Sequence, residues 1–325
     1  MKDKRYRGIE YLRISVTDRC NLRCVYCMPE EGISCLTHDE LLTFEEIVTI
    51  CKSAAALGVS KIKLTGGEPL VRRDFTSLVK QIKAIPGIEE ITLTTNGILL
   101  DNRLEELIEA GITKINVSLD TLDPKRFKEI TRIDGLETVL KAIKRASSHP
   151  KIQVKINSLI AKHLNEQEII SLAELAKRMP ISVRFIEVMP IGLGRHLETI
   201  SKNEMIEILE KQYGKLTPYE GKLGNGPAKY YEVPGFLGKI GFISAVSECF
   251  CDDCNRIRLT ASGYLKLCLH STKGLELKSL LREGISQEAL TEIISEAILN
   301  KPEKHHFGED FISDIEDKMM SQIGG

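Results

Sequence analysis

The chain has 325 residues, and its 45 basic and 46 acidic side chains give it a formal net charge of −1. This balance excludes a strongly basic nucleic-acid binder and an acidic, disordered tail protein. With 42% hydrophobic and 28% charged residues, the sequence predicts a globular protein with a sizeable core, and its length predicts one large domain with an appendage.

No apolar run is long enough to span a bilayer, and residues 1–15 lack the apolar segment of a secretory signal. We therefore expect a cytoplasmic protein with no membrane and no nucleic-acid partner. Because thiols stay reduced in that compartment, an odd number of cysteines, nine, favours metal ligation over a disulfide framework.

The first 190 residues alternate between apolar, strand-like runs and helical patterns. The predicted strands are Leu12–Val16, Lys61–Leu64, Glu90–Thr94, Lys114–Leu119, Ile152–Leu159 and Val183–Val188. The helical patterns between them include Thr43–Leu57, Phe75–Ile85, Arg103–Ala110 and Glu166–Met179. Thr43 and Asp101 are the expected N-caps, and Gly58 and Gly111 stand where helices should end.

Six βα repeats with short loops predict a parallel sheet covered by helices. Six units are fewer than the eight of a closed barrel. An open, partial barrel and a doubly wound sheet both fit the pattern, and periodicity does not choose between them.

The composition changes after residue 213. Gly214–Gly241 holds seven glycines and three prolines, including Gly221, Gly224 and Gly226, and we interpret it as turns and linker. A strand at Lys239–Ser244, a hairpin at Arg256–Leu269 and two helical patterns follow. We therefore expect a barrel over residues 1–213 and a separate C-terminal region over residues 214–325.

Polar or small residues cluster where the predicted strands end. These are Asp18–Cys20, Thr65–Glu68, Thr94–Asn96, Ser118, Asp120, Asn157, Glu187 and Met189. Ligands bind at the carboxyl ends of strands in parallel α/β folds, so this edge of the sheet is the predicted site. In Thr-Gly-Gly-Glu-Pro at 65–69, two glycines allow the backbone to approach a ligand closely.

Cysteine spacing gives the leading clue to the chemistry. Cys20, Cys24 and Cys27, the first cysteine set, follow the first predicted strand as C-x3-C-x2-C, so three thiolates can converge on one metal centre. Tetrahedral zinc would want a fourth protein ligand, and His38 is the nearest histidine. A [4Fe–4S] cluster held by three cysteines leaves one iron open. Spacing alone leaves the cluster, a zinc knuckle and buried thiols as alternatives.

Cys251, Cys254 and Cys268, the second cysteine set, follow a C-x2-C-x13-C pattern, and Cys249 lies close to them but outside it. Alone, this spacing also fits a zinc site. Beside the first set, a second iron–sulfur cluster with an open iron becomes the better interpretation.

Arg256 and Arg258 lie on one face of a predicted strand just after the second C-x2-C, where a solvated face is the simpler interpretation. Arg13, Lys63 and Lys155 lie in predicted inner strands, where an unpaired charge is costly to bury. Five cations near two metal centres favour a polyphosphate ligand of roughly four negative charges. A P-loop NTPase is excluded, because the sequence has no G-x4-G-K-[ST] run.

The first cysteine set, with Tyr26 before its last cysteine and its place after the first strand of βα repeats, resembles the radical S-adenosylmethionine (SAM) superfamily. Thr-Gly-Gly-Glu-Pro at 65–69 matches that superfamily's segment for the SAM amino group. The resemblance implies an α/β fold built as a partial, TIM-like (βα)6 barrel. It also implies a [4Fe–4S] cluster whose open iron binds SAM and whose electron cleaves SAM to methionine and a 5′-deoxyadenosyl radical.

Arg13–Pro29, the Arg-x-Arg after Cys254 and the terminal Gly-Gly resemble the GTP 3′,8-cyclase family of molybdenum cofactor biosynthesis, over nearly the whole chain. The resemblance implies that GTP is the substrate. The radical would take the ribose 3′ hydrogen, and C3′ would attack guanine C8. The product would be (8S)-3′,8-cyclo-7,8-dihydroguanosine 5′-triphosphate.

The same resemblance implies a role for each matching position. The first cysteine set would hold the SAM cluster, and the second a [4Fe–4S] cluster in the C-terminal extension whose open iron meets the guanine base. The residues that would contact SAM are Tyr26, Gly67, Ser118 and Met189. Those that would bind GTP are Arg13, Lys63, Thr94, Lys155, Arg256, Ile257 and Arg258. Those that would act in catalysis are Arg256, Arg258, Gly324 and Gly325, the two glycines by reaching back into the active site.

The implied partners are an electron donor of the flavodoxin or ferredoxin type and a downstream pterin synthase, and a homodimer is left as one option. The cysteine sets leave two alternative functions. A radical SAM peptide maturase with an auxiliary cluster usually carries more C-terminal cysteines than this chain. A non-catalytic zinc- or iron-storing scaffold has no need of the Thr-Gly-Gly-Glu-Pro segment.

Overall fold

The computed structural model describes residues 1–221, 223–305, 307, 316 and 318–324. Within them, twelve strands form one sheet. They are β1 (Tyr11–Ser15), β2 (Lys61–Thr65), β3 (Glu90–Thr95), β4 (Lys114–Ser118), β5 (Gln153–Ile160), β6 (Ser182–Glu187), β7 (Thr217–Pro218), β8 (Lys229–Glu232), β9 (Lys239–Ile243), β10 (Arg256–Leu259), β11 (Tyr264–Lys266) and β12 (Gly274–Glu276). No helix in these residues is long and apolar enough to cross a membrane.

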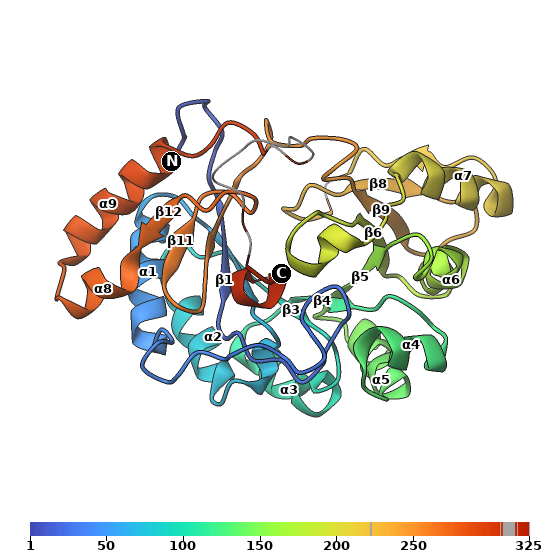
Figure 1. The fold of residues 1–325 in the computed structure, drawn as a ribbon, viewed down its shortest axis with the longest axis horizontal. Helices are drawn as coiled ribbons and strands as arrows, with labels where there is room; N and C mark the ends of the chain where they lie inside the picture. Colours follow the sequence, from blue (N-terminus) through green and yellow to red (C-terminus); the bar gives the residue numbers. More distant parts are fainter. Residues whose placement is uncertain (222, 306, 308–315, 317, 325) are drawn as a thin grey trace.

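The sheet runs in the order β12-β11-β10-β1-β2-β3-β4-β5-β6-β9-β8-β7. β1 to β6 follow chain order and pair in parallel, β10 and β9 continue the parallel pairing at either side, and the outermost strands are antiparallel. A doubly wound sheet would reverse its strand order, and this one does not. The sheet has two ends and curves on itself, so the predicted open barrel is confirmed (Figure 1).

Helices cover the outer side of the curved sheet, as Figure 1 shows. They are α1 (Phe44–Ala56), α2 (Phe75–Lys83), α3 (Leu100–Ala110), α4 (Pro124–Thr131), α5 (Leu136–Ser148), α6 (Ile169–Arg178), α7 (Lys202–Tyr213), α8 (Leu277–Arg282) and α9 (Gln287–Leu299). A short last helix, α10 (Met320–Ile323), lies instead inside the curve of the strands. Short 3₁₀ turns lie at Pro69–Val71, Glu166–Glu168 and Gly192–His196.

Local chemistry sets the helix ends. Thr43 caps α1 through a capping box with Glu46, as predicted for that position. Gly111 ends α3 with φ at 108°, a conformation that suits glycine. The predicted N-cap at Asp101 is wrong, because α3 begins one residue earlier and Leu99 precedes it. The Asp101 carboxylate instead pairs with Lys141 of α5 at 2.8 Å.

Strand alternation separates two faces with different chemistry. The residues that face the helices are apolar and buried; examples are Leu12, Ile14, Ile62, Leu64, Ile115, Val117 and Phe185. The alternate residues of the same strands face the inside of the barrel, and many of them are polar or charged. The hydrophobic core therefore lies between sheet and helices, and the barrel interior is left for a site.

Gly214–Gly241 is not only a linker, which corrects that interpretation. β7 and β8 lie within it and pair with each other and with β9, so the segment extends the sheet beyond β6. β10 to β12 extend the same sheet beyond β1. The division of the chain at residue 213 stays a prediction, and the strands that follow it continue the N-terminal sheet at both edges.

Candidate active site

Strand register gathers the charges of the inner face. Arg13 of β1 pairs with Lys63 of β2 on one side and with Arg258 of β10 on the other. Tyr11, two residues earlier in β1, pairs with Arg256 in the same way. Residues two apart on a strand share a face, so these side chains project together into the barrel.

The cations of this face have no anionic partner within the part of the chain that the structure describes. Among the described residues, Arg13, Lys63, Arg184, Arg256 and Arg258 form no ion pair, and the Nε atoms of Arg13, Arg184 and Arg256 are buried without a hydrogen-bond acceptor. Burial and then the charge of Arg13 hold the pKa of Lys63 well below its usual range. Burial, with Arg13 and Arg256 close by, lowers the pKa of Arg258 to about 9. Such a cluster strongly favours an anionic ligand.

Both cysteine sets and all five of these cations line one cavity of about 330 Å³, a size that suits a small-molecule ligand. The predicted site residues that line it are Arg13, Cys20, Cys24, Tyr26, Cys27, Lys63, Gly67, Thr94, Ser118, Met189, Cys251, Cys254, Arg256, Arg258 and Cys268. The structure thus brings together residues from β1, β2, β3, β4 and β10, from the loops that follow β1, β2, β6 and β11, and from the segment that precedes β10.

Two predicted GTP contacts lie elsewhere. Lys155 lines a smaller cavity of about 20 Å³, which shares Lys63 and Arg184 with the larger one. Its ammonium donates to the carbonyl of Leu223, and burial, followed by the charge of Arg184, lowers its pKa to about 7. Ile257 is 1% exposed and packs in the core, because it alternates with its two arginine neighbours. Its side chain faces away from the cavity.

The first cysteine set lies on the loop after β1. The Arg132 guanidinium, at the end of α4, donates to the carbonyls of Arg23 and Met28 and pins this loop. Burial raises the pKa of all three thiols, to about 12 for Cys27. Ligation by a metal centre is the ordinary way for such buried thiols to lose their protons.

The Thr-Gly-Gly-Glu-Pro segment packs tightly against this cysteine loop. A Cβ at Gly66 would lie 2.5 Å from the carbonyl oxygen of Thr17, and one at Gly67 would lie 2.4 Å from that of Arg19. Glycine is therefore required at both positions. The following Glu68 is fully buried and accepts from the Thr95 hydroxyl at 2.8 Å, so its carboxylate joins the ends of β2 and β3 rather than lining the cavity.

Tyr26 is held by Asp120, one of the polar residues predicted at the strand ends. Its hydroxyl donates to the Asp120 carboxylate at 2.6 Å, and Asp120 also accepts from the backbone N–H of Leu159. Burial raises the pKa of Asp120 to about 6, and these two hydrogen bonds oppose the increase. The pair fixes the loop of the first cysteine set against the ends of β4 and β5.

The second cysteine set lies beside a buried lysine. Lys301 donates to the carbonyls of Arg256 and Leu267 and so joins the ends of β10 and β11. Burial acts to raise the pKa of Cys254, but the charges of Lys301 and Arg256 outweigh it and the pKa is lowered. This position favours a thiolate, the form that binds metals.

In neither cysteine set do the three sulfur atoms all lie within 4.8 Å of one another. A single metal ion would need them close together, whereas a cluster places each thiolate on a different iron. The residues therefore fit a [4Fe–4S] group at each set. Gly66 and Gly67 have no side chains, so only their backbone lies beside the first set.

The C-terminal tail reaches into the barrel. α10 lies inside the curve of the strands in Figure 1, and Met320 and Ser321 line the cavity. Gly324 accepts a hydrogen bond from Arg258 Nη1 at 3.0 Å, and Ile323 is 1% exposed. The other predicted tail residue, Gly325, lies outside the described residues.

Arg184 and Asn116 are site residues that sequence reasoning missed. Arg184 Nη2 donates to Asn116 Oδ1 at 2.6 Å, and Asn116 Nδ2 donates to Thr94 Oγ1 at 3.2 Å. This chain joins β6, β4 and β3 across the inner face. The sequence could have identified Arg184, because it is a cation within a predicted inner strand, as are Lys63 and Lys155.

Comparison with known proteins matches most of the chain to two families. Residues 14–176 match the radical SAM superfamily, and residues 181–307 match the family described as Molybdenum Cofactor Synthesis C. The GTP 3′,8-cyclase of Clostridium perfringens (strain SM101 / Type A) is 49% identical over 325 residues, covering 100% of both chains. That of Pelotomaculum thermopropionicum is 47% identical over 331 residues, again covering 100% of both.

Among solved structures, Streptococcus suis SuiB bound to S-adenosylmethionine is similar to this chain with a TM-score of 0.60. The match covers 92% of this chain and 73% of SuiB, at 17% sequence identity. At that identity the likeness supports the fold alone.

Proposed function

The chain belongs to the GTP 3′,8-cyclase family, radical SAM enzymes of molybdenum cofactor synthesis, and we propose that it cyclises GTP in the cavity inside its sheet. The observation that carries this proposal is that both cysteine sets and the unpaired cations line the same cavity. A substrate with one charged and one uncharged end can then contact the cations with its charged end and lie beside the cysteine sets with the other. The product proposed is (8S)-3′,8-cyclo-7,8-dihydroguanosine 5′-triphosphate.

The first cysteine set would hold the cluster that binds SAM. Bound there, a [4Fe–4S] group supplies the electron that splits SAM into methionine and a 5′-deoxyadenosyl radical. Tyr26, Gly67, Ser118 and Met189 line the cavity around it and would orient SAM. The Tyr26–Asp120 hydrogen bond supports this role, because it holds the loop and an aromatic ring in one arrangement.

The cations would hold the GTP triphosphate. Arg13, Lys63, Arg256 and Arg258 have no counter-ion among the described residues, and the Nε atoms of Arg13 and Arg256 are buried without an acceptor, so a phosphate chain would satisfy groups that are otherwise costly. We add Arg184 to the predicted contacts, because it lines both cavities. Lys155 would join them from the smaller cavity.

The second cysteine set would hold a second [4Fe–4S] cluster with an open iron for the guanine base. Support comes from the three thiols that line the cavity and from the lowered pKa of Cys254. In this proposal Arg258 and Gly324 lie beside the bound GTP. The hydrogen bond from Arg258 to Gly324 would hold the Arg258 guanidinium in position. The tail and the buried cations would also exclude water from the radical.

An electron donor of the flavodoxin or ferredoxin type would reduce the clusters, and a pterin synthase would consume the product. The alternative of a peptide maturase is supported by no more than a shared fold with SuiB, which has also been solved bound to the precursor peptide SuiA. A metal-storing scaffold is disfavoured, because the chain belongs to an enzyme family.

The test is anaerobic reconstitution of the full chain with iron and sulfide. We expect about eight irons per chain, for two four-iron clusters, and formation of 5′-deoxyadenosine that depends on GTP, together with the cyclised nucleotide. Uptake of zinc in place of iron, or 5′-deoxyadenosine formation indifferent to GTP, would contradict the proposal.

A further inference from the structure

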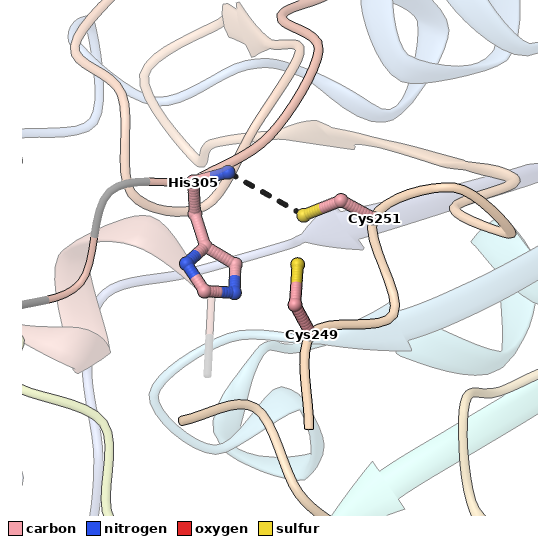
Figure 2. Close-up of side chains that lie close together, drawn as sticks. All are labelled: Cys249, Cys251 and His305. Atoms are coloured by element: carbon pink, nitrogen blue, oxygen red, sulfur yellow. Dashed lines mark hydrogen bonds between the residues drawn. The ribbon is translucent and has the colours of Figure 1, made fainter. Parts of the chain in front are cut away.

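Cys249, Cys251 and His305 bring three metal-ligating atoms together beside the second cysteine set. Their two sulfur atoms and an imidazole nitrogen all lie within 4.8 Å of one another. Figure 2 shows both thiols and the imidazole ring turned toward the same space. Among the described part of the chain, this is the only group of three or more His, Cys, Asp or Glu ligand atoms that converge so closely.

The separation of these atoms is near that of a single-ion site. Zinc lies about 2.3 Å from sulfur and about 2.0–2.1 Å from nitrogen, which in a tetrahedron puts ligand atoms roughly 3.5–3.8 Å apart. The three atoms would therefore need to close by at most about 1 Å. The His305 backbone N–H already donates to Cys251 Sγ at 3.4 Å, so the two segments touch before any ion is bound.

A buried arginine holds together the two segments that supply the ligands. Arg7 Nη1 donates to the carbonyl of Cys251 and to that of Glu303, both at 2.9 Å, and Nη2 donates to Pro302 at 2.7 Å. The Arg7 side chain is 4% exposed and its Nε lies 2.5 Å from the Asp3 carboxylate. Because these contacts use backbone carbonyls, they position the segments whether or not the second cysteine set carries a cluster.

We propose that Cys249, Cys251 and His305 bind a single divalent metal ion of the zinc class while the second cluster is absent. Two thiolates and one imidazole suit a borderline-soft ion, and a water molecule would complete a tetrahedron. Cys249 is exposed, His305 is partly exposed and Cys251 is buried. An ion can therefore enter from solvent past Cys249, and the two thiols lose their protons to water as it binds.

Cys251 belongs both to this group and to the second cysteine set. The ion and the cluster therefore exclude each other, a consequence that rests on the proposed function of the second set. An ion held here occupies a thiolate that the cluster needs, and it must leave before the cluster is installed. The site is a holding state of the cluster-free protein.

Cobalt titration of the full-length, reduced, cluster-free chain under anaerobic conditions tests the site. Co²⁺ bound by thiolates in a tetrahedron gives sulfur-to-metal charge transfer in the near ultraviolet and strong d–d bands in the visible. We expect wild type to bind one equivalent more than Cys249→Ala, with those bands in the difference spectrum and with Zn²⁺ displacing them. The matched control is Cys35→Ala, which removes another exposed thiol and should match wild type.

The first cysteine set can also take cobalt, but it contributes equally to wild type and Cys249→Ala and so cancels in the difference. Cys268→Ala should keep the extra equivalent, because Cys268 is not part of the group. X-ray absorption of the zinc form of Cys268→Ala, minus that of the Cys249→Ala/Cys268→Ala double variant, should show two sulfur neighbours and one imidazole nitrogen.

Iron reconstitution completes the test. Cys249→Ala should take up as much iron as wild type, and cluster-loaded wild type should no longer bind the extra cobalt. Equal cobalt binding by Cys249→Ala and Cys35→Ala would overturn the site. Loss of iron from Cys249→Ala would show that Cys249 serves the cluster instead. A protein that takes up no iron but keeps the cobalt difference would refute the proposed function and leave the ion site standing.

Discussion

Gly324→Ala is a sharp test of the C-terminal tail. Gly324 has φ at 77°, and a Cβ there would lie 2.9 Å from Ser15 Cβ. The left-handed conformation costs an alanine about 1–2 kcal/mol, and the steric overlap costs about 1–3 kcal/mol. The substitution should therefore strain the docked tail by roughly 2–5 kcal/mol.

The interactions that hold the tail are of similar size. The Arg258 hydrogen bond to Gly324 is charge-assisted and contributes about 1.5–3 kcal/mol. The buried Ile323 contributes about 1.5–3 kcal/mol. The strain therefore nearly cancels the docking energy, and even its low end, about 2 kcal/mol, should raise the undocked fraction roughly thirtyfold.

The assay is the rate at which carboxypeptidase removes the tail, read beside anaerobic GTP turnover. We expect faster removal and a sharp fall in cyclised product, with cluster content unchanged. Gly284→Ala is the control, since Gly284 has φ at 83° but open space around its Cβ, so it should cost stability without affecting turnover. Full turnover and wild-type resistance to carboxypeptidase in Gly324→Ala would refute the docked-tail reasoning.

Three further predictions follow from the site. Arg258→Ala should weaken GTP binding measured by calorimetry by about tenfold to a hundredfold, the loss of one charge-assisted contact, whereas the exposed Lys52→Ala should not; equal affinity in both would return Arg258 to a structural role. Cys24→Ser should abolish SAM cleavage, but Cys254→Ser should retain some while forming no cyclised product; equal loss of 5′-deoxyadenosine in both would contradict the division between the two sets. Lys155 has its folded pKa lowered to about 7 by burial, so the unfolded chain binds more protons above that pH and the free energy of unfolding should rise from about pH 7 to 10. Phosphate binding should reverse that pKa shift, so calorimetry near pH 8 in two buffers should detect proton uptake with GTP in wild type and less in Lys155→Met.

Local patterns were enough to predict the six inner strands and their order, whereas the choice of an open barrel came from the family resemblance and the edges of the sheet were missed. The six inner strands have strong apolar periodicity and clear helix ends, so their order followed from the sequence. β7 and β8 are short and lie among glycines and prolines, where propensity indicates turns. They form because β9 offers them a paired edge, which is a tertiary effect. Asp101 failed as a cap for a similar reason, since its partners on α5 lie far along the chain.

The site residues also divide into those that local sequence patterns predict and those that depend on tertiary contacts. Cysteine spacing predicted which thiols act together, because each set lies within one short segment or hairpin. Arg184, Asn116 and Lys301 were missed, because their roles depend on which strands become neighbours. The group of Cys249, Cys251 and His305 joins two segments that only the fold brings together.

The pairing of β10 with β1 has a consequence for synthesis of the chain on the ribosome. About 240 residues separate the two strands. At a synthesis rate of roughly 5–20 residues per second, the edge of β1 that pairs with β10 stays unpaired for about 12–48 s. An unpaired strand edge invites pairing with another chain, and an inward-pointing charge is one of the devices that discourage it. Arg13, in the middle of β1, therefore protects the nascent protein from misassembly long before it has a ligand to bind.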